Sequence, residues 1–227
     1  MVLQKALCII IGYVFGLFQT GFIIGKMHNI DIRDYGSGNS GTTNTMRTLG
    51  KKYGFITYFG DALKAVFAII LTSFMFGKVC SDSMMVIALY TGLGVVLGHN
   101  FPFYMNFKGG KGIAASSGVI FAISFFDWKF VIMGFLTFFI ALYLTKYVSF
   151  SSLCMMTGFF IEMIVWGQLG MVHNLHSNDK IEAYILVFIM TALSFIRHKE
   201  NIKRLLNGTE RKIGHKKEES KDRKSVV

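Results

Sequence analysis

The chain has 227 residues, a formal net charge of +11, and hydrophobic residues at 52% of its positions. The apolar residues gather in blocks of about 17–22, long enough to cross a hydrocarbon core of about 30 Å, and the charges fall between the blocks, which argues against a water-soluble fold. No soluble nucleic-acid-binding motif is visible, so the basic charge indicates membrane orientation and anionic headgroups, and we expect no nucleic-acid partner.

The first apolar block covers residues 2–24. It is longer than the apolar core of a signal peptide, which has about 7–15 residues. The residues that follow it, Lys26, Met27 and His28, do not form a small-residue cleavage site. We therefore expect a retained helix.

Six more apolar blocks follow in chain order, at residues 54–76, 84–101, 113–126, 129–147, 148–167 and 181–196. With the first block they predict an all-α protein, a polytopic membrane helix bundle with about seven transmembrane helices. The block 113–126 has about 14 residues, which is short for a full crossing at 1.5 Å per residue. Its length alone leaves open whether it is a full or a partial span.

Lys and Arg fall mainly on one side of the predicted bundle. Seven spans put residues 25–53, residues 102–112, the turn at Lys146 and the tail from Arg197 on the same side, with eight basic residues before the tail and eleven in it. The opposite side carries four, which are Lys5, Lys78, Lys129 and Lys180. Because cytoplasmic loops are enriched in Lys and Arg, we expect the first side and the C-terminus to be cytoplasmic and the N-terminus to be outside. Without the fourth span, the polar motifs described below would lie on both sides of the membrane.

The chain is predicted to form one integral membrane domain, residues 1–214, followed by a polar tail, residues 215–227, that mixes both charge signs and is expected to be disordered. Cys8, Cys80 and Cys154 lie far apart, in or beside apolar blocks, which is typical of small buried hydrophobic residues and not of metal ligands. The sequence indicates no metal, no cofactor and no obligate protein partner.

The first unusual polar segment reads Gly-Ser-Gly-Asn-Ser-Gly-Thr-Thr-Asn-Thr-Met-Arg over residues 36–47. Its glycine spacing matches a dinucleotide-binding fingerprint, but that fingerprint needs a βαβ unit, and the neighbours here are membrane helices. Glycine lets backbone N–H groups converge on an anion, and Arg47 can bind a phosphate with two hydrogen bonds. We favour a phosphate-binding loop over the alternative, an ordinary flexible loop.

The second polar segment, residues 98–112, ends in Lys-Gly-Gly-Lys-Gly and leads directly into an apolar block. Three glycines around Lys111 predict an anion-binding loop, in which a phosphate lies at a helix N-terminus. The full P-loop spacing is missing, so a nucleotide is not implied. The alternative for Lys108 and Lys111 is charge that sets the topology, and His99 fits a structural hydrogen bond as well as a ligand-binding role.

The third polar segment covers residues 197–210. His198, Asn201 and Leu205 fall on one helical face by their spacing of three and four residues. By itself this segment would be interpreted as a basic amphipathic helix on the cytoplasmic membrane surface.

Three polar residues lie inside the predicted spans. Asp61 and Lys64 are three residues apart, so they can pair on a helix. Glu162 has no obvious partner nearby in the sequence. We favour structural roles for all three.

The three polar segments, in this order and on this spacing, resemble the bacterial acyl-phosphate:glycerol-3-phosphate acyltransferase family, the PlsY type. The resemblance covers nearly the whole chain, up to Glu210. The motifs that carry it are Ser-Gly-Asn-x-Gly-x-Thr-Asn with a following Arg, Gly-His-x-Phe-Pro followed by Phe-Lys-Gly-Gly-Lys-Gly, and Arg-His-x-x-Asn-Ile-x-Arg-Leu-x-x-Gly-x-Glu. Two positions depart from the family: Thr42 stands where Ala is usual, and the residues after the lysine loop lack a usual Thr, for which Ser116 is a candidate substitute.

The resemblance implies a seven-helix bundle in the bacterial cytoplasmic membrane with its active site facing the cytoplasm. The implied reaction transfers a fatty acyl group from acyl phosphate to the 1-hydroxyl of glycerol 3-phosphate, which gives lysophosphatidate and phosphate. This would be the first acylation step of phospholipid biosynthesis, and it uses no metal and no cofactor. Acyl phosphate, glycerol 3-phosphate and membrane lipid are the implied partners.

The implied catalytic residues are Ser37, Arg47, His198 and Asn201. His198 is the candidate general base, with a substrate phosphate as the alternative proton acceptor. We expect the loop around Lys111 to hold acyl phosphate, Arg47, Ser37 and Asn201 to orient glycerol phosphate, and the acyl chain to lie in a groove between apolar helices that is open to lipid. The implied substrate-binding residues are Asn39, Gly41, Asn44, Lys108, Gly109, Gly110, Lys111, Gly112 and Glu210.

A transporter of a small phosphorylated anion is the alternative from a different class, because glycine-rich breaks and basic loops suit transport as well. That alternative predicts polar residues deep within paired spans and internal symmetry, and the chain shows neither clearly. A purely structural membrane scaffold would not explain the polar loops.

Overall fold

The structure is a computed structural model, and it describes residues 1–213. Every regular element within that range is a helix, which confirms the all-α prediction. The tail predicted at residues 215–227, and residue 214 at the end of the predicted domain, lie outside the described residues.

The first apolar block forms two helices, α1 (Val2–Gly16) and α2 (Thr20–Met27), and not one continuous helix. α1 packs closely against a later helix, α5 (Met84–Asn100), through glycines on both sides. A Cβ atom on Gly12 would overlap the carbonyl oxygen of Thr91, and one on Gly98 would overlap that of Tyr13. Small residues allow this close backbone approach, which is a common way for helices to associate in membranes.

The centre of the bundle is α5, in which nearly every residue is buried. It packs against α1, α4 (Lys51–Phe76), α6 (Ile113–Ile123) and α9 (Lys180–Arg197). A helix that is apolar on all sides is expected to be surrounded by other helices.

The remaining long helices are α7 (Lys129–Thr145) and α8 (Val148–Gln168), which pack against each other beside α6 and α9. α9 is followed by α10 (Lys199–Leu206), and the axis bends by 61° between them. The helices begin and end within a few residues of the predicted apolar blocks, except for the break in the first block and the early end of α6.

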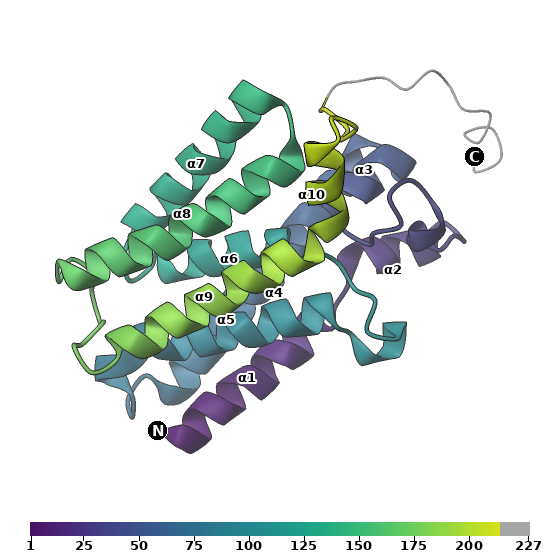
Figure 1. The fold of residues 1–227 in the computed structure, drawn as a ribbon. Coiled ribbons are helices and arrows are strands. Elements are labelled where there is room, and N and C mark those ends of the chain that lie inside the picture. Colours follow the sequence, from purple (N-terminus) through teal and green to yellow (C-terminus); the bar gives the residue numbers. More distant parts are fainter. Residues whose placement is uncertain (214–227) are drawn as a thin grey trace.

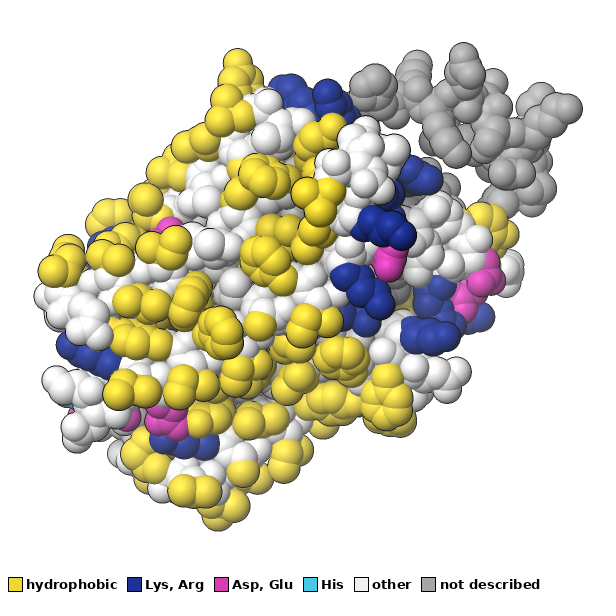
Figure 2. All heavy atoms as spheres, in the orientation of Figure 1, with side chains coloured by type: hydrophobic (Ala, Val, Ile, Leu, Met, Phe, Trp, Pro, Cys, Tyr) yellow, Lys and Arg dark blue, Asp and Glu magenta, His cyan; other side chains and the backbone are white. Residues whose placement is uncertain are grey.

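Helical stretches that are long and apolar enough to cross a membrane are found at Val2–Met27, Lys51–Phe76, Ser81–Met105 and Val148–Gln168 among residues 1–213, and α9 with α10 makes a fifth if the bent pair is one span. α6 and α7 are apolar but shorter. Large apolar side chains face outward over much of the face of the bundle that Figure 2 shows, and Phe74 is 88% exposed. The chain is therefore a polytopic membrane helix bundle.

The polar segments gather at one end of this bundle. In Figure 1, α2, α3 (Thr42–Leu49) and α10 lie together at the end that is remote from the N-terminus. Within residues 1–213, short 3-10 helices also occur at Ile32–Asp34 (η1), Ser81–Ser83 (η2) and Phe103–Met105 (η3). The basic side chains in Figure 2 are concentrated at the same end as α3 and α10.

Candidate active site

The first polar segment is held in shape by Asn44, whose side chain is 1% exposed. Its amide NH2 group donates to the carbonyls of Ile32 at 2.9 Å and Tyr35 at 3.0 Å. Its carbonyl oxygen accepts from the backbone N–H of Ser37 at 2.7 Å and from the Ser37 hydroxyl at 3.1 Å. Protein groups therefore occupy the hydrogen-bonding capacity of Asn44, and the turn that it fixes presents Ser37 at the surface.

The start of α3 is shaped by the neighbouring residues of the same segment. Gly36 and Gly38 have φ of +62° and +71°, a backbone conformation that favours glycine. The side chain of Asn39 accepts from the N–H of Gly41 at 3.0 Å, which turns the chain into α3. Arg47 lies in the last turn of α3 and is half-buried.

The second polar segment folds back onto the end of α5. The N–H of Gly109 donates to the carbonyl of Asn100 at 3.2 Å, and the N–H of Gly110 donates to that of His99 at 3.1 Å. Gly112 has φ of +84° and immediately precedes α6. The loop therefore ends at a helix N-terminus, where free N–H groups and the helix dipole favour an anion.

Residues of the third polar segment form hydrogen bonds with the second polar segment. Arg197 donates from Nη2 to the carbonyl of Gly109 at 2.8 Å and from Nε to that of Gly110 at 3.2 Å. The Lys111 ammonium donates to Oδ1 of Asn201, which is itself 7% exposed. Lys111 is thereby fixed beside α10, whereas Lys108, three residues earlier, is exposed.

Glu210 connects the second and third polar segments to α8 through hydrogen bonds. Its carboxylate accepts from Asn201 Nδ2 at 2.7 Å, Arg204 Nε at 2.7 Å and the Ser149 hydroxyl at 2.9 Å. Burial raises the pKa of the carboxyl, but these three hydrogen bonds outweigh that effect, so the pKa is lowered and Glu210 is charged. Ser149 and Arg204 were not among the predicted site residues, and nothing near Ser149 in the sequence connects it to Glu210.

Positive charge exceeds negative charge around this network. Burial lowers the pKa of Lys111 to about 8, the charge of Glu210 opposes that effect, and Arg204, Arg47 and Arg197 lower the pKa further. Arg47 from the first segment is thus electrostatically coupled to residues of the second and third segments. A cluster with excess positive charge, beside a glycine loop, is suited to bind phosphate.

His198 lies at the bend between α9 and α10 and is 3% exposed. Its Nδ1 atom is 2.8 Å from the carbonyl oxygen of Ser194. A carbonyl oxygen only accepts, so Nδ1 carries the hydrogen and Nε2 keeps its lone pair. Burial, followed by the charge of Lys111, lowers the pKa of His198 to about 4, which leaves the ring neutral at pH 7.

The geometry defines a class of protein: a polytopic membrane helix bundle with a glycine loop, a group of Lys and Arg side chains and a neutral histidine at one end. A family model described as glycerol-3-phosphate acyltransferase matches residues 6–208. A glycerol-3-phosphate acyltransferase of Alkaliphilus metalliredigens is 40% identical over 212 residues, which cover 92% of this chain and 96% of the relative. One of Bacillus subtilis is 40% identical over 209 residues, with coverages of 92% and 97%.

The fold is also similar to solved structures. A crystal structure of PlsY, an integral membrane glycerol 3-phosphate acyltransferase in its glycerol 3-phosphate form, superposes with a TM-score of 0.77 at 34% identity, and the match covers 92% of this chain and 96% of that one. Its lysophosphatidic acid form gives a TM-score of 0.75 at 33% identity, with coverages of 92% and 95%. The chain belongs to the glycerol-3-phosphate acyltransferase family, of the PlsY type.

Proposed function

We propose that the protein transfers a fatty acyl group from acyl phosphate to the 1-hydroxyl of glycerol 3-phosphate and releases lysophosphatidate and inorganic phosphate. The observation that carries this proposal is the convergence of two phosphate-binding segments beside one neutral histidine. One segment holds Arg47 and Ser37, and the other holds Lys111 at the start of α6. Acyl phosphate and glycerol 3-phosphate both carry a phosphate next to the reacting atoms and need two adjacent anion sites, whereas the phosphates of an acyl-CoA lie far from its thioester.

In this proposal the loop of residues 109–112 binds acyl phosphate. Lys111 and the free N–H groups at the start of α6 neutralise the phosphate, which makes it a better leaving group. Asn201 contacts Lys111 and Glu210, so it aligns the ammonium. Lys108 is exposed and lies outside this hydrogen-bonded network, so we assign it a weaker contribution to attraction of the donor.

Arg47 and Ser37 bind glycerol 3-phosphate. The Ser37 hydroxyl donates to Asn44, which leaves its oxygen free to accept a hydrogen bond from a glycerol hydroxyl. An amide cannot take a proton from Ser37, so Ser37 is suited to orient the acceptor and not to act as a covalent nucleophile.

The hydroxyl oxygen of glycerol 3-phosphate attacks the acyl carbonyl carbon, and the bond between that carbon and the phosphate oxygen breaks. The proton leaves the hydroxyl through Nε2 of His198 and ends on the released phosphate. A pKa of about 4 makes His198 a weak base, so its main contribution is to hold the hydroxyl in line for attack. The mixed anhydride is already reactive, so alignment and charge neutralisation supply most of the rate.

A groove of about 520 Å³ lies between α1, α5 and α9 on their lipid-facing side, and it can hold the acyl chain. Ile189 lines it and lies nine residues before His198, or about 13 Å along a helix. Since an extended chain of sixteen carbons is longer than that distance, we place the acyl tail in this groove.

We propose that seven helices cross the membrane and that residues 1–214 form a single domain in the bacterial cytoplasmic membrane, without an obligate protein partner. The short α6 begins at the site, while Lys129, six residues after its end, donates to the carbonyl of Met171 at 2.6 Å in the loop before α9. Ser83 contacts Asp179 at 2.7 Å in that same region. These contacts support a path in which α6 and its extension reach the far end of the bundle, with the site facing the cytoplasm.

The test is an assay of the protein in lipid with palmitoyl phosphate and glycerol 3-phosphate, in which phosphate and lysophosphatidate are measured. Palmitoyl-CoA is supplied in parallel as the competing donor. We expect product from acyl phosphate alone, about a 100-fold loss in Lys111→Ala, and a loss of less than about 3-fold in the matched variant Lys108→Ala. Product from the CoA ester alone would overturn the donor, and flux of glycerol phosphate into liposomes without any product would favour transport.

A further inference from the structure

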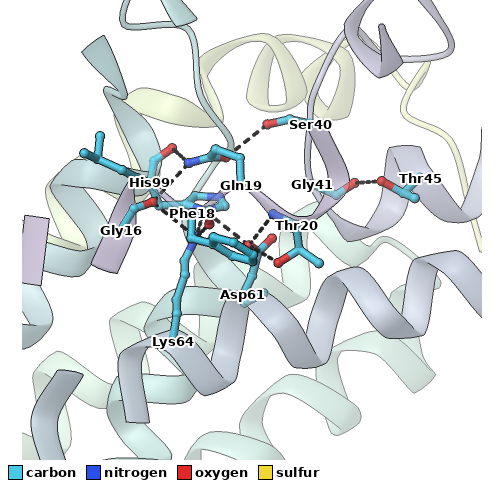
Figure 3. A network of polar contacts seen from close by, with 12 residues as sticks. Gly16, Phe18, Gln19, Thr20, Ser40, Gly41, Thr45, Asp61, Lys64 and His99 are labelled. Atoms are coloured by element: carbon cyan, nitrogen blue, oxygen red, sulfur yellow. Dashed lines mark hydrogen bonds and ion pairs between the residues drawn. The ribbon is translucent and has the colours of Figure 1, made fainter. Parts of the chain in front are cut away.

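A buried charged cluster lies directly behind the two phosphate-binding segments. It consists of Asp61 and Lys64 on α4, His99 on α5, and Gln19 at the break between α1 and α2, and each is 5% exposed or less. The Lys64 ammonium donates to Oδ1 of Asp61 at 3.0 Å and to Nδ1 of His99 at 2.8 Å. Figure 3 shows Lys64 and Asp61 projecting from one helix toward the helix break.

The cluster stabilises the helix break. Lys64 donates to the carbonyl of Phe18 at 2.5 Å and is 3.3 Å from that of Gly16. Asp61 accepts from the N–H and the hydroxyl of Thr20 at 3.3 and 3.1 Å. Backbone groups freed by a broken helix inside a membrane need such partners, because lipid offers none.

Gln19 connects the two phosphate-binding segments through this break. Its Nε2 donates to the carbonyl of His99 at 2.9 Å, the same oxygen that accepts from the N–H of Gly110. Its Oε1 accepts from the hydroxyl of Ser40 at 3.3 Å, and Ser40 lies two residues before the start of α3. One side chain therefore joins the base of the second segment to the base of the first.

His99 packs against the backbone of the second segment. Because the ammonium of Lys64 can only donate, Nδ1 of His99 accepts, and Nε2 carries the hydrogen. A Cβ atom on Gly110 would overlap Nε2, and one on Gly109 would overlap the carbonyl oxygen of His99. The imidazole thus lies against the loop backbone at Gly110, and of the two roles that the sequence allowed for His99 the structure shows the structural hydrogen bond.

We infer that Asp61, Lys64, His99 and Gln19 are positioning residues that set the separation between the two phosphate-binding segments. This inference rests on the proposed function. Stability alone does not explain the cluster, because a buried ion pair is often replaced by apolar residues without loss of stability. Ionisable residues inside membranes are retained mainly where they serve function.

The central test is the double variant Asp61→Asn/Lys64→Met, which removes both charges and leaves none unpaired. If the cluster positions the segments, the KM values of the folded double variant for palmitoyl phosphate and glycerol 3-phosphate rise by about 10-fold or more and its kcat falls, whether or not its thermal midpoint is lowered. The matched control is Thr72→Val/Thr91→Val, which removes a buried hydrogen-bonded pair between the same two helices, 2.8 Å apart, away from the site. It should leave both KM values within about 2-fold.

A second measurement does not depend on turnover. Hydrogen exchange of residues 36–47 and 106–112, measured by mass spectrometry in lipid nanodiscs, should be about 10-fold faster in the double variant than in wild type or the control. Gln19→Met changes no charge and should have the same effect if the double variant does not fold. Wild-type exchange and KM values in Gln19→Met and in any folded double variant would overturn the inference. An inactive wild type would overturn the proposed function and leave the exchange comparison intact.

Discussion

The environment of Lys111 lowers the pKa of its ammonium group into the pH range in which the enzyme would be assayed. Burial is the main reason that its pKa is lowered to about 8. The charged form binds phosphate, so we expect kcat/KM for acyl phosphate to fall as the pH rises through about 8. A bound phosphate stabilises the ammonium, so the fall in kcat should lie at higher pH. In Lys111→Arg the alkaline fall should disappear from the measured range, because guanidinium stays protonated. An unchanged alkaline fall in that variant would assign it to another group.

Glu210 stabilises the end of the bundle that carries the site. Replacing it with Gln keeps the shape but removes the charge that receives three hydrogen bonds, and we expect a loss of about 1.5–3 kcal/mol in stability. The folded pKa is lowered, so this stabilisation is present above the unfolded value of about 4.3 and is lost as the pH falls through the folded value. Thermal midpoints of wild type and variant should therefore converge in acid. Glu200→Gln, which lies exposed on the preceding helix α10, should leave the midpoint unchanged at neutral pH.

At the scale of single helices, α9 carries the end of the acyl groove nearest to His198. Ile189 is 37% exposed and lines that groove. In Ile189→Trp the indole would fill the groove, so kcat/KM for palmitoyl phosphate should fall about 10-fold, or about 1.4 kcal/mol, while octanoyl phosphate is little affected. Assays with acyl phosphates of increasing length measure this shift. Ile161→Trp, which faces lipid from α8 outside the groove, is the control. Equal losses for both chain lengths would contradict a chain-length role for the groove.

Local sequence patterns predicted the long helices but not the short helix α3 or the break between α1 and α2. The apolar blocks predicted the positions of the long helices to within a few residues, because hydrophobicity over about twenty residues is a local property. α3 was expected to be part of a polar loop. Its Thr- and Asn-rich sequence has a low helix propensity, and it is stabilised by packing on α4, where Gly54 lies directly against Met46. The break at residues 17–19 was missed because the residues that satisfy it, Lys64 and Asp61, are more than forty positions away.

At the scale of the whole molecule, the proposed orientation and span count can be tested by labelling. In a variant with Cys8, Cys80 and Cys154 replaced by Ala, a membrane-impermeant maleimide should label Lys78→Cys in intact cells but label Lys52→Cys only after permeabilisation. Both positions are exposed. Trp128→Cys, between α6 and α7 and 64% exposed, should behave like Lys78→Cys if α6 crosses the membrane. Labelling of Trp128→Cys together with Lys52→Cys would show that the chain returns without crossing.

The sequence by itself determined that this is an all-α membrane protein with polar motifs of a known acyltransferase family, because apolar blocks, charge asymmetry and short motifs are read along the chain. Only the tertiary structure decided which motif residues touch one another. Lys111 and Asn201 are 90 positions apart, Ser149 and Glu210 are 61 apart, and Lys64 and His99 are 35 apart. The sequence left Asp61 and Lys64 as a local pair, and the fold joined them to His99 and the helix break. Contacts of this kind depend on how the helices pack, and no local pattern of hydrophobicity or charge encodes them.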